Sequence, residues 1–182
     1  MYIISQPMKT SQIAEHIREV KDFPKEGISF KDITPILSNP DLSAEVVDSL
    51  VECLNDKEVD AIVGVESRGF LFGMLLANAI KVPFIPIRKA GKLPHNTIVE
   101  EYALEYGTAK VEIHTDAIKE GWNIVIHDDL LATGGTAVAA SKLVKRLGGN
   151  ITSFLFIVEL SFLDGRTSLF DYSTSIKSLV KY

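Results

Sequence analysis

The sequence predicts an α/β domain built around a parallel sheet. Residues 61–65 and 83–87 are short apolar runs typical of buried strands, and a helical segment at residues 70–80 separates them. A second strand, helix and strand follow at residues 123–127, 133–147 and 151–160. Two such units indicate a parallel α/β sheet, and the length of 182 residues fits one domain of ordinary size.

Two helices are expected before the first of these units. Apolar residues at helical spacing predict a short amphipathic helix over residues 11–20, at Ile13, Ile17 and Val20. Asn39 as a cap and Pro40 in the first turn predict a stronger helix. Its apolar stripe is formed by Leu42, Val46, Leu50 and Cys53 or Leu54. We interpret Cys53 as a core residue rather than a catalytic one.

A hairpin is expected between the two strand–helix–strand units. Residues 109–114 alternate strictly between apolar and polar side chains, which predicts a half-buried strand. This strand is expected to pair with residues 99–106 through a turn near Gly107. The stretch at residues 88–97 is polar and rich in lysine, glycine and proline, which predicts a mobile loop.

Composition excludes several functional classes. The net charge of −5 does not fit a general nucleic-acid binder, which usually carries a basic surface. The only cysteine cannot form an intrachain disulfide, which favours a reducing, cytoplasmic setting. The first residues do not resemble a signal peptide, and no apolar stretch reaches the roughly 18 residues that a membrane helix needs.

The strand at residues 123–127 is followed by Asp128 and Asp129, and then by a small polar turn that opens a helix. The turn consists of Ala132, Thr133, Gly134, Gly135 and Thr136. Ligands of parallel sheets bind at the carboxyl ends of the strands, and a helix N-terminus presents unpaired amides and a positive dipole end. Because glycines let a phosphate approach those amides, the turn suits a phosphate monoester.

The paired aspartates suit a different group. Carboxylates repel a phosphate, but they accept hydrogen bonds from vicinal hydroxyls and attract Mg²⁺. A phosphate beside a diol indicates a ribose 5-phosphate. The nucleotide P-loop and the Gly-x-Gly-x-x-Gly dinucleotide fingerprint are both absent from the sequence. The alternative is an ordinary strand-to-helix turn, and the adjacent aspartates argue against it.

The block at residues 125–137 resembles the signature of the type I phosphoribosyltransferases, which bind 5-phosphoribosyl 1-pyrophosphate. The resemblance implies a mainly parallel twisted sheet with helices on both faces and a flexible hood. It implies one phosphoribosyltransferase domain over residues 1–182, with a hood contribution from about residues 1–35 and a mobile lid over about residues 88–108.

The segment Glu66-Ser67-Arg68 is similar to the pyrophosphate loop of this family. The similarity implies a non-proline cis bond between Glu66 and Ser67, and it makes Arg68 a planar donor fork for pyrophosphate. The alternative for Arg68 is a solvated turn residue. Cations of the polar loop would neutralise the leaving group if the loop folded over it, and they are Arg88, Lys89 and Lys92. The alternative is a solvated charge run.

Further motifs resemble the adenine-specific branch of the family, over about residues 23–159, and they lie at residues 30–33, 91–94 and 104–107. The resemblance implies that Phe30 stacks on the base and that backbone groups near Lys31 read its edge. Glu105 would meet the imidazole side of the purine and donate a proton, and Tyr106 would close the lid. From the residues alone, Phe30 is equally a core aromatic and Glu105 a surface carboxylate.

The implied reaction converts adenine and 5-phosphoribosyl 1-pyrophosphate to AMP and pyrophosphate in purine salvage. The catalytic set would be Arg68, Glu105, Asp128 and Asp129. The implied cofactor is Mg²⁺, held mainly by the pyrophosphate and the ribose hydroxyls, with water-mediated contacts to the aspartates as an option. A homodimer is also implied. The alternatives are an enzyme for hypoxanthine, guanine or xanthine and a non-catalytic sensor of the sugar, and the charge of −5 argues against the sensor.

Two positions depart from the family pattern. Lys31 stands where many relatives have arginine, so a bidentate contact is not available there. His127 occupies a position that is usually aliphatic. It could hydrogen-bond to Asp128 or to a neighbouring backbone group, or face the other side of the sheet, and we favour a structural role for it.

Overall fold

A seven-stranded sheet forms the centre of the computed structural model, which describes residues 10–55, 57–103 and 107–182. In spatial order its strands are β5 (Thr97–Ala103), β6 (Thr108–His114), β4 (Phe84–Lys89), β3 (Ala61–Val65), β7 (Asn123–Leu131), β8 (Asn150–Glu159) and β9 (Ile176–Lys181). Strands β4, β3, β7, β8 and β9 run parallel, whereas β6 is antiparallel to both β4 and β5. The predicted mainly parallel sheet is therefore confirmed.

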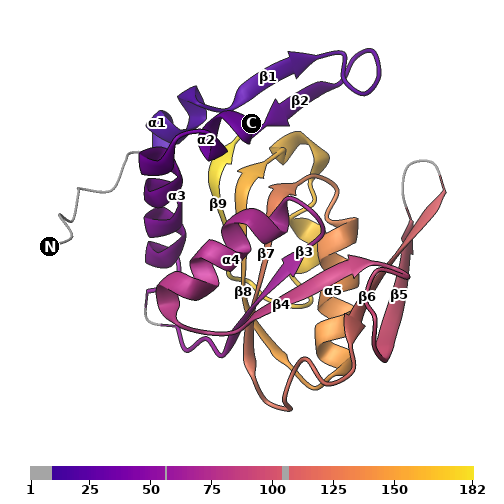
Figure 1. Cartoon of the computed structure of the whole chain (residues 1–182). Helices are drawn as coiled ribbons and strands as arrows, with labels where there is room; N and C mark the ends of the chain where they lie inside the picture. The colour runs from indigo at the N-terminus through magenta and orange to yellow at the C-terminus, as the bar shows by residue number, and fades with distance from the viewer. Residues whose placement is uncertain (1–9, 56, 104–106) are drawn as a thin grey trace, which may run out of the picture.

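Helices cover both faces of this sheet (Figure 1). On one face lie α1 (Thr10–Glu15), α2 (Thr34–Leu37), α3 (Pro40–Glu52) and α4 (Gly69–Ile80), and on the other lies α5 (Gly135–Arg146). The alternation of β3 serves both layers, because Val63 packs in the core beside α5 and Ile62 in the core that holds Phe72 of α4. No described helix is long and apolar enough to cross a membrane.

The chain also forms two antiparallel hairpins, one separate from the seven-stranded sheet and one at its edge (Figure 1). One is the antiparallel pair β1 (Arg18–Lys21) and β2 (Ser29–Asp32), which lies near the C-terminus of the chain. The other is the predicted pair β5 and β6, whose closing residues 104–106 lie outside the described residues. Both hairpins stand at the end of the sheet where the parallel strands finish.

Several predicted bounds need correction. The helix expected over residues 11–20 ends at Glu15, and Val20 instead pairs with Phe30 in the β1–β2 hairpin. Strand β4 continues through Arg88 and Lys89, which were expected in a loop. Strand β7 runs to Leu131, so the two aspartates lie within the strand rather than after it.

The C-terminal part of the chain holds elements that the sequence did not predict. Two short 3₁₀ helices, Ser161–Leu163 and Thr167–Leu169, follow β8, and β9 then adds a parallel edge strand. The capped helix α3 is as predicted: the side chain of Asn39 accepts hydrogen bonds from two amides of its first turn. Leu54 completes the buried stripe of α3, whereas Cys53 is half-buried at its edge.

Candidate active site

The ends of β3 and β7 bring the predicted site residues together. The two strands are parallel neighbours, with Gly64 opposite His127, so the loop after β3 and the end of β7 lie side by side. Arg68 bridges them: its Nε donates a hydrogen bond to Oδ2 of Asp129. No described residue accepts a hydrogen bond from the terminal nitrogens of Arg68, which leaves them for a ligand.

A cleft of about 340 Å³ opens at this junction. Its lining combines carboxylates, cations and the start of the polar turn, and it consists of Glu66, Ser67, Arg68, Lys89, Tyr102, Asp128, Asp129, Leu130, Ala132 and Thr136. The peptide bond between Glu66 and Ser67 is cis, as predicted. The cleft therefore gathers seven of the predicted site residues from three separate parts of the chain.

The two aspartates differ in their surroundings. Asp129 is 4% exposed and carries the Arg68 contact, which compensates its charge. Asp128 forms no ion pair with any described residue, and burial together with the neighbouring carboxylate of Asp129 raises its pKa well above the ordinary range. Gly69 allows this packing, because a Cβ at this position would lie 2.9 Å from Oδ1 of Asp128. The neutral form of Asp128 is therefore more accessible than that of a free carboxyl group.

The polar turn forms a second, smaller hollow of about 70 Å³ next to the cleft. All five predicted phosphate-binding residues line it, namely Ala132, Thr133, Gly134, Gly135 and Thr136. Gly134 adopts φ +85°, a conformation that favours glycine, and it caps α5 without a side-chain hydrogen bond. The first amides of this twelve-residue helix therefore face the hollow without a capping side chain, as an anion site requires.

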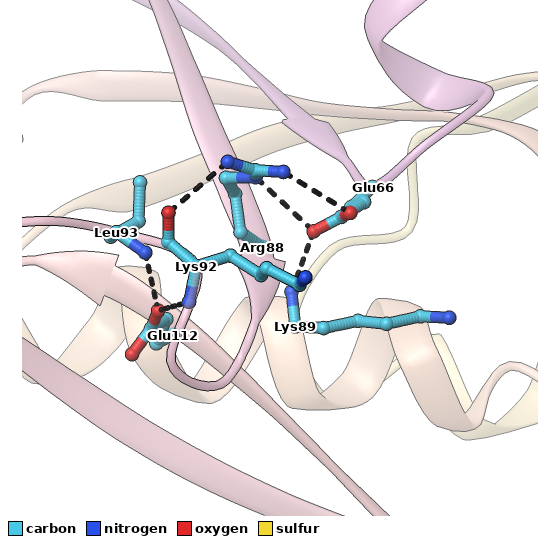
Figure 2. Close-up of polar contacts among 6 residues, drawn as sticks. All are labelled: Glu66, Arg88, Lys89, Lys92, Leu93 and Glu112. Atoms are coloured by element: carbon cyan, nitrogen blue, oxygen red, sulfur yellow. Dashed lines mark hydrogen bonds and ion pairs between the residues drawn. The ribbon is translucent and has the colours of Figure 1, made fainter.

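Glu66 fixes the cationic end of β4 (Figure 2). Its carboxylate accepts hydrogen bonds from the backbone N–H of Lys89 at 2.9 Å and from Nε and Nη2 of Arg88 at 3.2 and 3.3 Å. Burial alone would raise the pKa of Glu66, but these donors outweigh it and lower the pKa. Arg88 is thus held by protein groups, whereas the side chain of Lys89 extends away from them and lines the cleft.

Glu112 holds the turn that follows β4 (Figure 2). Its Oε1 accepts hydrogen bonds at 2.8 Å from the backbone N–H groups of both Lys92 and Leu93, and its Oε2 accepts one from Thr97. Glu112 is only 4% exposed, and although burial acts against it, these amides lower its pKa. Nη1 of Arg88 also donates to the carbonyl of Lys92 at 3.1 Å. The side chain of Lys92 is exposed and does not line the cleft.

Phe30 reaches the same end of the sheet from the β1–β2 hairpin. The guanidinium of Arg68 lies 5.5 Å from the centre of its ring, and Phe23 packs against the ring edge-on. Phe30 is only half-buried, so it is not a core aromatic. Lys31, the next residue, projects elsewhere: its Nζ donates to Ser29 and lies 4.2 Å from the ring centre of Tyr182.

The comparisons with known proteins agree with this geometry. The model of the phosphoribosyl transferase domain matches residues 32–166, which includes the cleft and the phosphate turn. The chain belongs to the phosphoribosyl transferase family. The mainly parallel sheet with helices on both faces is accordingly the type I phosphoribosyltransferase fold that the sequence predicted.

Similar proteins cover nearly the whole chain. An adenine phosphoribosyltransferase from Cytophaga hutchinsonii is 49% identical over 178 residues, 98% of each chain. One from Alkaliphilus metalliredigens is 54% identical over 166 residues, 91% of this chain and 96% of its own. The crystal structure of the adenine phosphoribosyltransferase from Thermoanaerobacter pseudethanolicus superposes with a TM-score of 0.92 at 50% identity, covering 96% of this chain and all of that one.

Two predicted residues cannot be placed in the phosphoribosyltransferase site. Glu105 and Tyr106 lie outside the described residues, so their roles stay predictions. The structure adds Tyr102, which lines the cleft from β5 three residues earlier. It also shows that Glu66 and Glu112 hold the segment at residues 88–93, which carries Arg88, Lys89 and Lys92. No sequence pattern indicated this role, because it depends on contacts across the sheet.

His127 is a structural residue in this family member. Its ring is fully buried, and Nδ1 lies 3.0 Å from the carbonyl oxygen of Leu155 in the neighbouring strand, so Nδ1 carries the proton. Its Nε2 has no hydrogen-bond partner among the described residues. A Cβ at Gly73 would lie 3.3 Å from the ring, which places His127 under α4. Burial lowers its pKa to about 4.

Proposed function

We propose that the chain transfers the 5-phosphoribosyl group from 5-phosphoribosyl 1-pyrophosphate to adenine, forming AMP and pyrophosphate. One observation carries the proposal: a single cleft joins a phosphate turn, a pair of aspartates and a group of cations. The relatives that match at about half identity over nearly the whole chain are adenine phosphoribosyltransferases. The Saccharomyces cerevisiae enzyme, 42% identical, has been crystallised with adenine and an imino-altritol bisphosphate.

The sugar lies along the end of β7 in this proposal. Its 5′-phosphate occupies the hollow at residues 132–136, where the first amides of α5 and the hydroxyls of Thr133 and Thr136 donate hydrogen bonds. Asp128 and Asp129 accept hydrogen bonds from the two ribose hydroxyls. The homologous enzyme from Trypanosoma brucei, 26% identical over 94% of this chain, has been crystallised with AMP, pyrophosphate and ribose 5-phosphate.

The leaving pyrophosphate meets the cations on the other side of the cleft. The terminal nitrogens of Arg68 and the amine of Lys89 stabilise the negative charge that develops as the C1–oxygen bond breaks. Positive charge develops at C1 at the same time, and the carboxylates of Asp128 and Asp129 lie nearest to it. The purine nitrogen forms the new bond on the opposite face of C1, with inversion, and the imidazole proton of the purine passes to the carboxylate of Glu105, which donates it back in the reverse reaction.

Mg²⁺ is part of this proposal as a cofactor of the substrate. Among the described residues, no group of three or more histidine, cysteine or acidic side chains is arranged to hold a metal ion. Asp129 is already bound by Arg68, and Asp128 has a raised pKa, so the protein offers a weak site by itself. Pyrophosphate oxygens and ribose hydroxyls would therefore supply most ligands, and the metal would neutralise the leaving group.

The base binds between the β1–β2 hairpin and the lid. The half-buried ring of Phe30 stands beside Arg68 and provides a face on which a purine can stack. Because the side chain of Lys31 is engaged with Ser29 and Tyr182, only its backbone groups would read the edge of the base. Glu105 exchanges a proton with the imidazole side of the purine, and Tyr106 closes over it.

Pyrophosphate release that depends on adenine tests this function directly. Purified protein, 5-phosphoribosyl 1-pyrophosphate and Mg²⁺ are mixed with adenine, hypoxanthine, guanine or xanthine in separate assays. We expect release with adenine and formation of an equal amount of AMP. A faster reaction with another purine would reassign the base and leave the sugar site intact. Sugar binding without release for any base would point to a sensor.

The functional assembly and its location complete the proposal. We propose that the enzyme is a homodimer in the cytoplasm, in line with the single half-buried cysteine and the family resemblance. An apolar stripe on α4 offers a surface for a second copy, because Leu71, Met74 and Leu75 are 42%, 54% and 44% exposed.

A further inference from the structure

An ion pair with a buried carboxylate lies behind the phosphate turn. Glu159, the last residue of β8, is 4% exposed, and its two oxygens accept hydrogen bonds from Nε and Nη2 of Arg166 at 3.0 and 2.5 Å. Ser178 of β9 donates to the same carboxylate at 2.6 Å, and Nη1 of Arg166 donates to the carbonyl of Ile176 at 2.8 Å. Arg166 therefore ties the segment after β8 to both β8 and the edge strand β9.

Gly165, directly before Arg166, packs against the turn itself. A Cβ at Gly165 would overlap the carbonyl oxygen of Ala132 and lie 2.8 Å from the amide nitrogen of Gly134. A Cβ at Gly134 would in turn lie 2.6 Å from the carbonyl oxygen of Gly165. Ser168 adds a hydrogen bond to the carbonyl oxygen of Thr133 at 3.3 Å. The back of the turn thus rests on the backbone of residues 165–168.

The ion pair and the turn are also linked through the sheet. Glu159 stands opposite Leu131, the last residue of β7, and the amide of Leu160 donates to the carbonyl of Leu131 at 2.9 Å. The end of β8 and the segment at Gly165 therefore both contact the chain where β7 leads into the phosphate turn. Glu159, Gly165 and Arg166 line neither the cleft nor the phosphate hollow, so they can act on a ligand only through residues 132–136.

We propose that Glu159 and Arg166 are positioning residues, which press the Gly165 backbone against residues 132–136 and so hold the amides of the turn in register with the 5′-phosphate. The inference rests on the proposed function, because that function assigns the turn to the phosphate. A planar guanidinium can hold Glu159 with two nitrogens and Ile176 with the third, and the single amine of lysine cannot. The turn has no capping side chain of its own, so its geometry depends on this support.

Binding of two separate ligands tests the proposal. Titration calorimetry is carried out with ribose 5-phosphate and, separately, with pyrophosphate, on the wild type, Arg166→Lys and Gly165→Ala. We expect both variants to bind ribose 5-phosphate about ten- to a hundredfold more weakly, since a displacement of about 1 Å costs that much. Pyrophosphate binding, which uses Arg68 and Lys89, is expected to stay within about twofold. The KM for the sugar should rise more than kcat falls.

Arg146→Lys is the matched control. Arg146 also binds a carboxylate and a backbone carbonyl, those of Glu100 and Val99, but at the far end of α5. Its variant should bind both ligands as the wild type does. Thermal melting shows whether each variant is folded. Gly165→Ala disturbs the contact between residue 165 and the phosphate turn while leaving the ion pair intact.

The outcomes separate the two levels of the proposal. Equal weakening of ribose 5-phosphate and pyrophosphate in Arg166→Lys would indicate a general structural role and overturn the positioning role. Unchanged binding of ribose 5-phosphate would overturn the positioning role as well. Weaker binding in Gly165→Ala alone would show that the ion pair does not take part in positioning. A wild type that binds pyrophosphate but not ribose 5-phosphate would instead contradict the proposed function of the turn.

Discussion

His127 shows how one buried side chain links stability to pH. The neutral ring is held under α4 by its hydrogen bond to Leu155, and its pKa is lowered to about 4 because burial disfavours the charged form. The unfolded chain has the ordinary histidine pKa of about 6.5. Between these two values the unfolded state binds a proton that the folded state does not bind. The free energy of unfolding therefore rises with pH in this window, and above it the titration of His127 no longer changes stability.

The substitution His127→Asn removes the titration and keeps a donor for Leu155. We expect the wild type to lose up to ~1.4 kcal/mol of unfolding free energy per pH unit more than the variant between pH 6.5 and about 4. Urea unfolding of both proteins at pH 7.5, 6.0 and 5.0 measures this difference. Parallel pH profiles of the two proteins would show that the ring is not held neutral.

The two aspartates of the cleft should differ in catalysis. Asp129 pairs with Arg68, so Asp129→Asn removes a carboxylate near C1 and releases the arginine. We expect kcat to fall about 10²- to 10³-fold while AMP binding weakens only a few-fold. Asp128→Asn should cost less, because the raised pKa of Asp128 means that its neutral form is already accessible. Equal losses of turnover and AMP binding in Asp129→Asn would make this residue a ligand holder only.

At the scale of elements, Glu112 of β6 determines where the turn after β4 lies. Its carboxylate accepts hydrogen bonds from two backbone N–H groups of that turn at 2.8 Å, and Figure 2 shows it facing these groups. Glu112→Gln keeps the size but replaces one acceptor oxygen with a donor, which weakens these charge-assisted bonds. We expect the KM for 5-phosphoribosyl 1-pyrophosphate to rise about tenfold and the unfolding free energy to fall by about 1–3 kcal/mol.

Glu101→Gln is the control on the same hairpin, because the Glu101 side chain is 49% exposed and forms a surface ion pair with Lys110. Steady-state kinetics and chemical unfolding are measured on both variants and the wild type. A KM change of the same size in the two variants would mean that the hairpin responds to charge in general. The Glu112 contacts would then not determine the position of the turn after β4.

Patterns within one segment predicted the central elements well. The apolar runs of β3 and β8 are buried on both sides, and Asn39 and Pro40 mark the start of α3 by local chemistry alone. The segment around Val20 failed, because a β-branched residue at helical spacing also fits a strand once it finds a partner in Phe30. Strand β9 was missed because its pattern is short and is completed only by pairing with β8.

At the scale of the whole molecule, the sequence predicted residues that line the cleft and the phosphate hollow but not the groups that support them. Arg68, Asp129 and the glycine turn could be found because each lies within a short sequence motif with a recognisable chemical role. Glu112 lies on the polar face of an alternating strand, so its burial arises only when the turn after β4 covers it. The Glu159–Arg166 pair likewise depends on three separate segments meeting at the sheet edge.

The apolar stripe of α4 gives a prediction about assembly. Leu71, Met74 and Leu75 are exposed on the outer side of this helix, whose first residue directly follows Arg68. A second copy packed on α4 would bury these side chains and hold the start of the helix, so the dimer would also stabilise the arginine loop. In a two-fold interface every substitution occurs twice.

Met74→Asp therefore places two carboxylates in the proposed interface. We expect the dissociation constant of the dimer to rise about a thousandfold or more, since each unpaired polar group that is buried costs a few kcal/mol. Sedimentation velocity over a range of concentrations measures it, with Leu37→Asp as a control at another exposed leucine. A dimer that tolerates Met74→Asp would place the interface elsewhere, and a lower kcat in the dissociated variant would show that association reaches the Arg68 loop.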